Sequence, residues 1–128
     1  MKNFLLCMLA VTALPFSGVA AEATDLTIHL NGSATISQTE IRYRCDAQGV
    51  KLGLPSGIFT VRYINGGGNS LAVVPVNSVS LIFANVTSGS GARYAAGPLI
   101  WWDAAGRSVT LSSDSLAGKS NSTCQRVQ

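Results

Sequence analysis

Hydrophobic and polar positions alternate with a period of two along most of the chain, in short segments that end at glycine, asparagine, proline or serine. Residues 59–64 are an example, because Phe59, Val61 and Tyr63 fall on one face and polar side chains separate them. This alternation is typical of a half-buried β-strand. Beyond the apolar N-terminal stretch, no segment keeps an apolar period of 3.6 over a normal helix length. The pattern therefore predicts a chain of strands and turns.

Eight to ten short strands are expected, without crossover helices between them. Consecutive hairpins give an antiparallel sheet, and many short strands bury their edges by closing into a barrel or splitting into a sandwich. An all-β barrel is the first expectation and a sandwich the alternative. Residues 22–37 are expected to form either an added strand or a loose arm. The predicted strands lie at residues 25–30, 41–45, 50–52, 59–64, 70–74, 78–86, 92–95, 99–102, 108–112 and 123–127.

The N-terminus has the pattern of an export signal. Lys2 precedes an apolar run over residues 4–16, and small residues then fit cleavage after Ala20 or Ala21. Cys7 lies inside the apolar run with only six residues before it, so lipidation is not expected. We therefore expect a periplasmic protein without a membrane anchor in its mature form. The expected organisation is a signal peptide at 1–20, an N-terminal arm or extra strand at 21–40 and a β-barrel domain at 41–128.

Cleavage leaves two cysteines, Cys45 and Cys124. In an oxidising compartment an isolated pair usually forms a disulfide, and this bridge would close a loop of nearly the whole domain. A metal or redox site would need further ligands or a C-x-x-C spacing, and neither is present in the sequence. The expectation is a structural disulfide, with no metal and no cofactor.

Charge and residue inventory point to a binding or structural protein. Without Lys2, eight basic residues stand against six acidic ones and are scattered singly, which is not the pattern of a nucleic-acid-binding protein. His29 is the only histidine, and no serine or cysteine motif offers it a catalytic partner. The carboxylates lie in different segments, and nothing in their spacing indicates a glycosidase pair. The protein is therefore not expected to be an enzyme.

Two stretches are more specific than the rest. Residues 88–94 contain the pattern Ser-Gly-x-x-Tyr at Ser90, Gly91 and Tyr94, and residues 99–111 form an aromatic strand, a turn with glycine and a strand ending in leucine. Together they resemble the two signature motifs of the membrane-bound and periplasmic inhibitors of C-type lysozyme. The similarity covers about 80 residues, from the Tyr-Arg-Cys-Asp segment to the second cysteine.

This resemblance implies an eight-stranded antiparallel barrel of the periplasmic branch, with C-type lysozyme as its protein partner. It implies that Ser90, followed by Gly91, enters the lysozyme cleft together with a basic residue from the second motif. The family usually has a lysine before the turn glycine, where this chain has Ala105, and Arg107 is the nearest cation. The remaining candidates are supports or rim residues: Arg93 and Tyr94 as supports, and Trp101 and Trp102 bracing the loop or contributing rim area.

Two other functions stay open at this point. Trp101 and Trp102 could serve a carbohydrate- or peptidoglycan-binding module as a stacking platform. One of the two is expected to face the core, since adjacent strand residues point in opposite directions. Alternatively, exposed strand edges could pair with copies of the same chain in a structural envelope protein. A homodimer would be compatible with inhibition as well.

Overall fold

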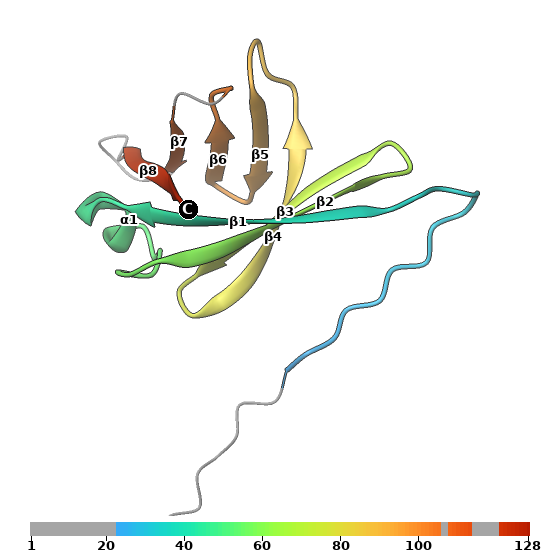
Figure 1. Ribbon diagram of the computed structural model, residues 1–128, viewed down its shortest axis with the longest axis horizontal. Helices are drawn as coiled ribbons and strands as arrows, with labels where there is room; N and C mark the ends of the chain where they lie inside the picture. Colours follow the sequence, from blue (N-terminus) through green and yellow to red (C-terminus); the bar gives the residue numbers. More distant parts are fainter. Residues whose placement is uncertain (1–22, 106–107, 114–120) are drawn as a thin grey trace, which may run out of the picture.

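The computed structural model describes residues 23–105, 108–113 and 121–128. Eight antiparallel strands pair in sequence order and close into a barrel, with β8 returning to β1 (Figure 1). The expected all-β barrel is confirmed, and the closed sheet is not a sandwich. No helix in the described part of the chain is long and apolar enough to span a membrane. The elements are β1 (Ser37–Cys45), α1 (Ala47–Lys51), β2 (Phe59–Gly66), β3 (Asn69–Val76), β4 (Val79–Val86), β5 (Ala92–Ala96), β6 (Leu99–Asp103), β7 (Val109–Ser113) and β8 (Asn121–Val127).

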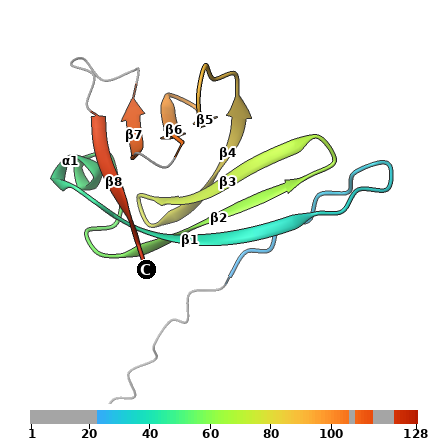
Figure 2. The same cartoon turned by 45° about the horizontal axis from the view of Figure 1, so that its top comes forward.

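The first strand changes partner along its length, and this closes the barrel. Its first seven residues pair with β2, ending at Tyr43 opposite Phe59. Its last four pair with β8, ending at Cys45 opposite Cys124 (Figure 2). The disulfide between Cys45 and Cys124 joins the strands at this seam, across 79 residues of sequence. The predicted disulfide is confirmed.

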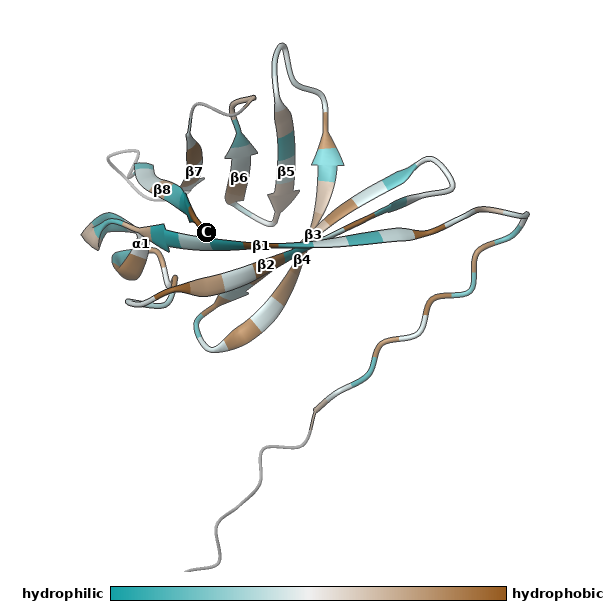
Figure 3. Ribbon diagram, viewed as in Figure 1, coloured by the Kyte–Doolittle hydropathy of each residue, from teal (hydrophilic) through white to brown (hydrophobic). Residues whose placement is uncertain are grey.

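The barrel interior is filled by aromatic and aliphatic side chains from alternate positions, as on β2, where hydrophobic and hydrophilic residues alternate (Figure 3). The Trp101 ring meets the Tyr43 ring edge-on, with centroids 5.3 Å apart. The Tyr63 hydroxyl accepts from Trp101 Nε1 at 2.9 Å and lies 3.0 Å from the Tyr43 hydroxyl. Burial raises the pKa of both tyrosines. Further fully buried side chains are Val61, Val74, Phe83 and Leu111.

A short helix replaces the strand predicted at residues 50–52, which was wrong. Asp46 is the N-cap of α1, and its Oδ1 accepts from the backbone N–H of Gly49 at 3.0 Å. Its other oxygen accepts from the N–H of Thr123 on β8 at 2.9 Å. Gly49 is buried, and a Cβ there would lie 2.7 Å from Ser122 Oγ. The chain therefore turns into a helix held against β8.

The N-terminal segment 23–36 contains no strand, so the strand predicted at 25–30 was wrong. Leu26, Ile28 and Leu30 alternate with polar residues as a strand would, but each is at least half exposed. The eight strands of the barrel pair with one another, and these residues pair with none of them. Figure 1 shows this segment running away from the start of β1.

Candidate functional site

The two sequence motifs meet at one end of the barrel. The motif loop, residues 87–91, joins β4 to β5, and the chain leaving β6 passes directly beside it at the upper edge of Figure 1. A Cβ placed on Gly91 would lie 2.0 Å from the backbone oxygen of Asp103 and 2.9 Å from the backbone nitrogen of Ala105. The backbone of the first motif therefore packs against the backbone of the second.

Gly91 is required here by the fold itself. Its φ is +65°, a left-handed conformation that L side chains rarely adopt, and its missing side chain makes room for β6. Gly89, two residues earlier, has nothing within 4 Å of the position a Cβ would take. The Ser-Gly-Ser-Gly segment at residues 88–91 thus contains one glycine that the neighbouring backbone requires, Gly91, and one with open space around it, Gly89.

The carbonyl of Ser90 is a hydrogen-bonding centre in the motif loop. It accepts from Trp102 Nε1 at 3.0 Å and from the Ser88 hydroxyl. Near the start of β5, the carbonyl of Arg93 accepts a hydrogen bond from Asn85 Nδ2 at 3.1 Å. Ser90 itself is exposed, so a residue whose carbonyl is anchored is accessible to a partner.

The aromatic candidates differ in how far their side chains are buried. Trp101 is fully buried, so its assignment to the rim is wrong, whereas Trp102 is 37% exposed. The expectation that only one of the two faces the core is confirmed. Tyr94 is 5% exposed, with its ring 5.8 Å from that of Tyr63. Tyr94 and Trp101 can therefore support the loop only from inside the barrel.

Arg93 and Trp102 are direct cross-strand partners on β5 and β6 and line a groove of about 410 Å³ on the outer face. The lining of this groove includes the start of the motif loop and the hydroxyl and amide side chains of Thr110, Ser112 and Asn121. The exposed Trp102 thus borders both the loop and the groove. The other lining residues are Thr87, Ser88, Gly89 and Ile100.

An ion pair lies near the motifs, and no pattern in the sequence predicted it. Arg126 on β8 contacts Asp103 Oδ2 at 2.6 Å, and this hydrogen bond raises the pKa of the Arg126 guanidinium. Because Asp103 ends β6 beside Gly91, the pair ties β8 to the second motif. Ala105 follows with a φ of +52°. The candidate Arg107 lies outside the described residues.

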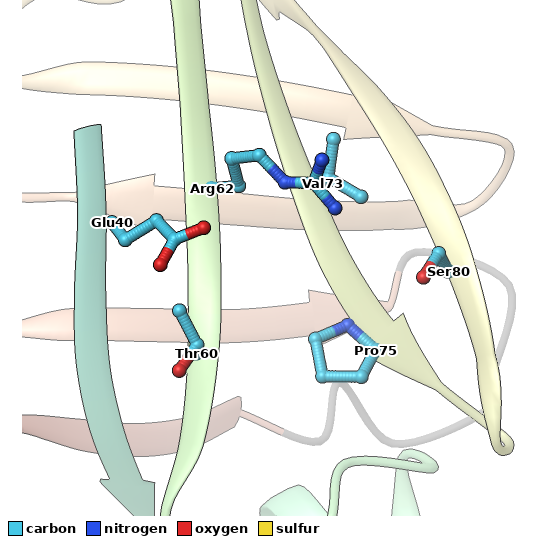
Figure 4. Close-up of a pocket in the computed structure, with 6 residues that line it drawn as sticks. All are labelled: Glu40, Thr60, Arg62, Val73, Pro75 and Ser80. Atoms are coloured by element: carbon cyan, nitrogen blue, oxygen red, sulfur yellow. The ribbon is translucent and has the colours of Figure 1, made fainter. Parts of the chain in front are cut away.

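The other described surfaces carry few groups that could bind a metal or catalyse a reaction. In the described ranges there is no group of three or more histidine, cysteine or acidic side chains able to hold a metal ion. His29 lies in the exposed N-terminal segment. A second outer groove of about 200 Å³ lies over β1–β4, where Glu40 and Arg62 are cross-strand partners (Figure 4). It is formed by other strands than those that carry the motifs.

Comparison with known proteins agrees with the motif arrangement. Residues 43–119 match the family described as membrane-bound lysozyme-inhibitor of c-type lysozyme. The chain belongs to this family. The resemblance inferred from the two motifs is thereby confirmed, and the family is one of inhibitors of an enzyme.

Two curated relatives carry the name membrane-bound lysozyme inhibitor of C-type lysozyme. The relative from Pseudomonas aeruginosa is 46% identical over 91 residues, covering 70% of this chain and 65% of the relative. The chain therefore spans slightly less than two thirds of that relative's length. The relative from Cupriavidus necator is 30% identical over 102 residues, covering 79% of this chain and 75% of the relative.

A solved structure with the same fold is the crystal structure of Pseudomonas aeruginosa MliC in complex with hen egg white lysozyme. It superposes with a TM-score of 0.63 and 38% identity, covering 84% of this chain and all of that one. That structure pairs a family member with a C-type lysozyme.

Proposed function

We propose that this protein inhibits C-type lysozyme by inserting the motif loop, with Ser90 foremost, into the active-site cleft of the enzyme. The observation that supports this proposal most is the exposure of Ser90, together with the fixed position of its backbone, in a chain of the inhibitor family. The residue is exposed, while its carbonyl is held by two donors and the following glycine packs against the backbone of β6. A fixed backbone at an exposed serine suits insertion into a narrow site.

The chemistry of the target explains why these groups would block it. Lysozyme, a standard example of a glycosidase, uses two carboxyl groups with separate acid and nucleophile roles. The Ser90 hydroxyl can donate a hydrogen bond to one carboxylate, and a guanidinium can pair with a carboxylate through two parallel N–H donors. We assign the second contact to Arg107, with Arg93 as a support, since Ala105 replaces the usual lysine. The sugar is then excluded from both groups.

The proposed site of action is the periplasm. The relatives' names agree with an exported envelope protein, and residues 1–20 have the pattern of a cleavable signal. We assign residues 21–40 to an arm that leads into β1, and residues 41–128 to the inhibitory domain. The disulfide at the β1–β8 seam suits an oxidising compartment.

Mixing the oxidised mature protein with hen egg white lysozyme, while lysis of bacterial cell walls is followed, tests the proposal. We expect lysis to stop at a stoichiometric ratio of inhibitor to enzyme. Undiminished lysis, in the presence of protein shown to be folded and disulfide-bonded, would contradict the proposed function.

The groove beside Trp102 favours a second candidate function, binding of cell-wall carbohydrate. An exposed indole surrounded by hydroxyl and amide groups is a suitable surface for a sugar ring. Calorimetric titration with soluble cell-wall glycan fragments, without lysozyme, tests this. Binding that Trp102→Ala removes and Ser90→Ala leaves intact would support it, and no heat of binding would rule it out.

A further inference from the structure

We infer that Trp102 is a positioning residue that holds Ser90 in its inhibitory geometry through the indole N–H. The inference rests on the proposed function, and of the two roles expected for Trp102, a brace for the loop or a rim contact, it selects the brace and assigns it to the indole N–H. It also explains why an aromatic strand and a serine–glycine loop occur together in one site.

The hydrogen bonds at Ser90 carry the inference. The carbonyl oxygen of Ser90 has two acceptor positions, and both are filled, by Trp102 Nε1 at 3.0 Å and by the Ser88 hydroxyl. A carbonyl held from two sides cannot rotate freely, which fixes the peptide plane between Ser90 and Gly91. Gly91 is fixed in turn by its contact with the backbone of Asp103.

Trp102 itself stands on a rigid support. It is the penultimate residue of β6, where its backbone pairs with Arg93 on β5 and Thr110 on β7. The Ser88 hydroxyl, by contrast, belongs to the motif loop and moves with it. The indole is therefore the side chain that connects the Ser90 carbonyl to the sheet.

A loop fixed before binding loses less conformational freedom when it enters a cleft. The indole N–H would thus increase affinity without touching the enzyme. Because this gain is obtained only through Ser90 and its neighbours, its loss should be visible in the free protein as well as in inhibition.

The test uses Trp102→Phe, which keeps an aromatic ring and removes the N–H donor. Two quantities are measured: the backbone amide NMR order parameters of residues 88–91 in the free protein, and the inhibition constant against hen egg white lysozyme. We expect lower order parameters in the motif loop and roughly tenfold weaker inhibition. Ile100→Val, in the same groove and on the same strand, is the matched control and should change neither.

A double variant separates positioning from direct contact. If Trp102 acts through Ser90, Ser90→Ala with Trp102→Phe inhibits no more weakly than Ser90→Ala alone, whereas two independent contacts would add. Additive losses, or unchanged loop order parameters in Trp102→Phe, would overturn the inference, as would lower order parameters with unchanged inhibition. The order-parameter measurement needs no lysozyme, so it remains informative if the wild-type protein fails to inhibit and the proposed function falls.

Discussion

At the scale of single residues, the motif loop shows two glycines with different tasks. Gly91 has a left-handed backbone and a Cβ position that would overlap the carbonyl oxygen of Asp103, whereas Gly89 faces open space. A glycine that enters an enzyme cleft and a glycine that the inhibitor's own fold demands look identical in sequence. Substitution by alanine distinguishes them.

Gly91→Ala is expected to lower the free energy of unfolding by roughly 2 kcal/mol or more, because left-handed strain adds to the displacement of β6. Inhibition should weaken in parallel, since Ser90 moves with its neighbour. Gly89→Ala should stay within about 0.5 kcal/mol of the parent protein. Denaturant unfolding measures both, and equal stability of the two variants would contradict this account of Gly91.

At the scale of elements, Asp46 links the helix α1 to the strand β8. Hydrogen bonds from the backbone N–H groups of Thr123 and Gly49 stabilise the carboxylate and hold the pKa of Asp46 below its ordinary value of 3.8. A carboxyl whose pKa is lower in the folded state stabilises the protein above the unfolded-state pKa. That stabilisation is lost as the pH falls through the folded-state pKa.

Asp46→Ala should therefore cost about 1 kcal/mol at neutral pH, a typical value for the loss of a helix N-cap. The difference from the parent protein should begin to shrink below about pH 4, the unfolded-state pKa, and should close as the pH falls through the lower pKa of Asp46 in the folded parent. Unfolding curves recorded at several pH values give the comparison, with Asp25→Ala in the exposed N-terminal segment as control. A difference that stays constant down to pH 2 would count against the assigned role.

The strand pattern was largely predictable because alternation reports which face of a strand is buried. It failed at residues 25–30, where alternation is present but the residues pair with no strand of the barrel, and at residues 50–52, where a capping carboxylate starts a helix. Pro75 lies past Val73, the last β3 residue paired with β2, as expected for proline at the end of a ladder.

The site was predictable only as a set of motifs. The spacing of Ser90, Gly91 and Tyr94 indicated the family, and adjacent tryptophans indicated one inward and one outward ring. The bond from Trp102 to the Ser90 carbonyl and the ion pair between Asp103 and Arg126 depend on how strands meet in space. No local pattern in a single sequence records such contacts.

At the scale of the whole molecule, the barrel closes at a seam of only four residue pairs between β1 and β8. The disulfide lies at the end of this seam and connects two ends of a loop spanning 79 residues. On the chain-entropy model a loop of that length is worth about 4.5 kcal/mol, reduced by strain and by residual structure in the unfolded chain.

Replacing both cysteines, as Cys45→Ala with Cys124→Ala, should lower the free energy of unfolding by about 2–5 kcal/mol. Inhibition by the fraction that remains folded should change little, because the motif loop is held by contacts to β6. Denaturant titration of the oxidised parent and the double variant measures the loss. Coincident unfolding curves would show that the short seam closes the barrel without its covalent bond.

The inhibition constant of Ser90→Ala against hen egg white lysozyme tests the central claim most directly. Removing a hydrogen bond to a charged group costs about 1.5–3 kcal/mol, so inhibition should weaken roughly ten- to a hundredfold at an unchanged unfolding midpoint. Ser80→Ala, at an exposed serine on β4 in the groove remote from the motifs, should inhibit like the parent. Equal inhibition by the parent and a folded Ser90→Ala protein would contradict the assignment of Ser90 as the inserted group.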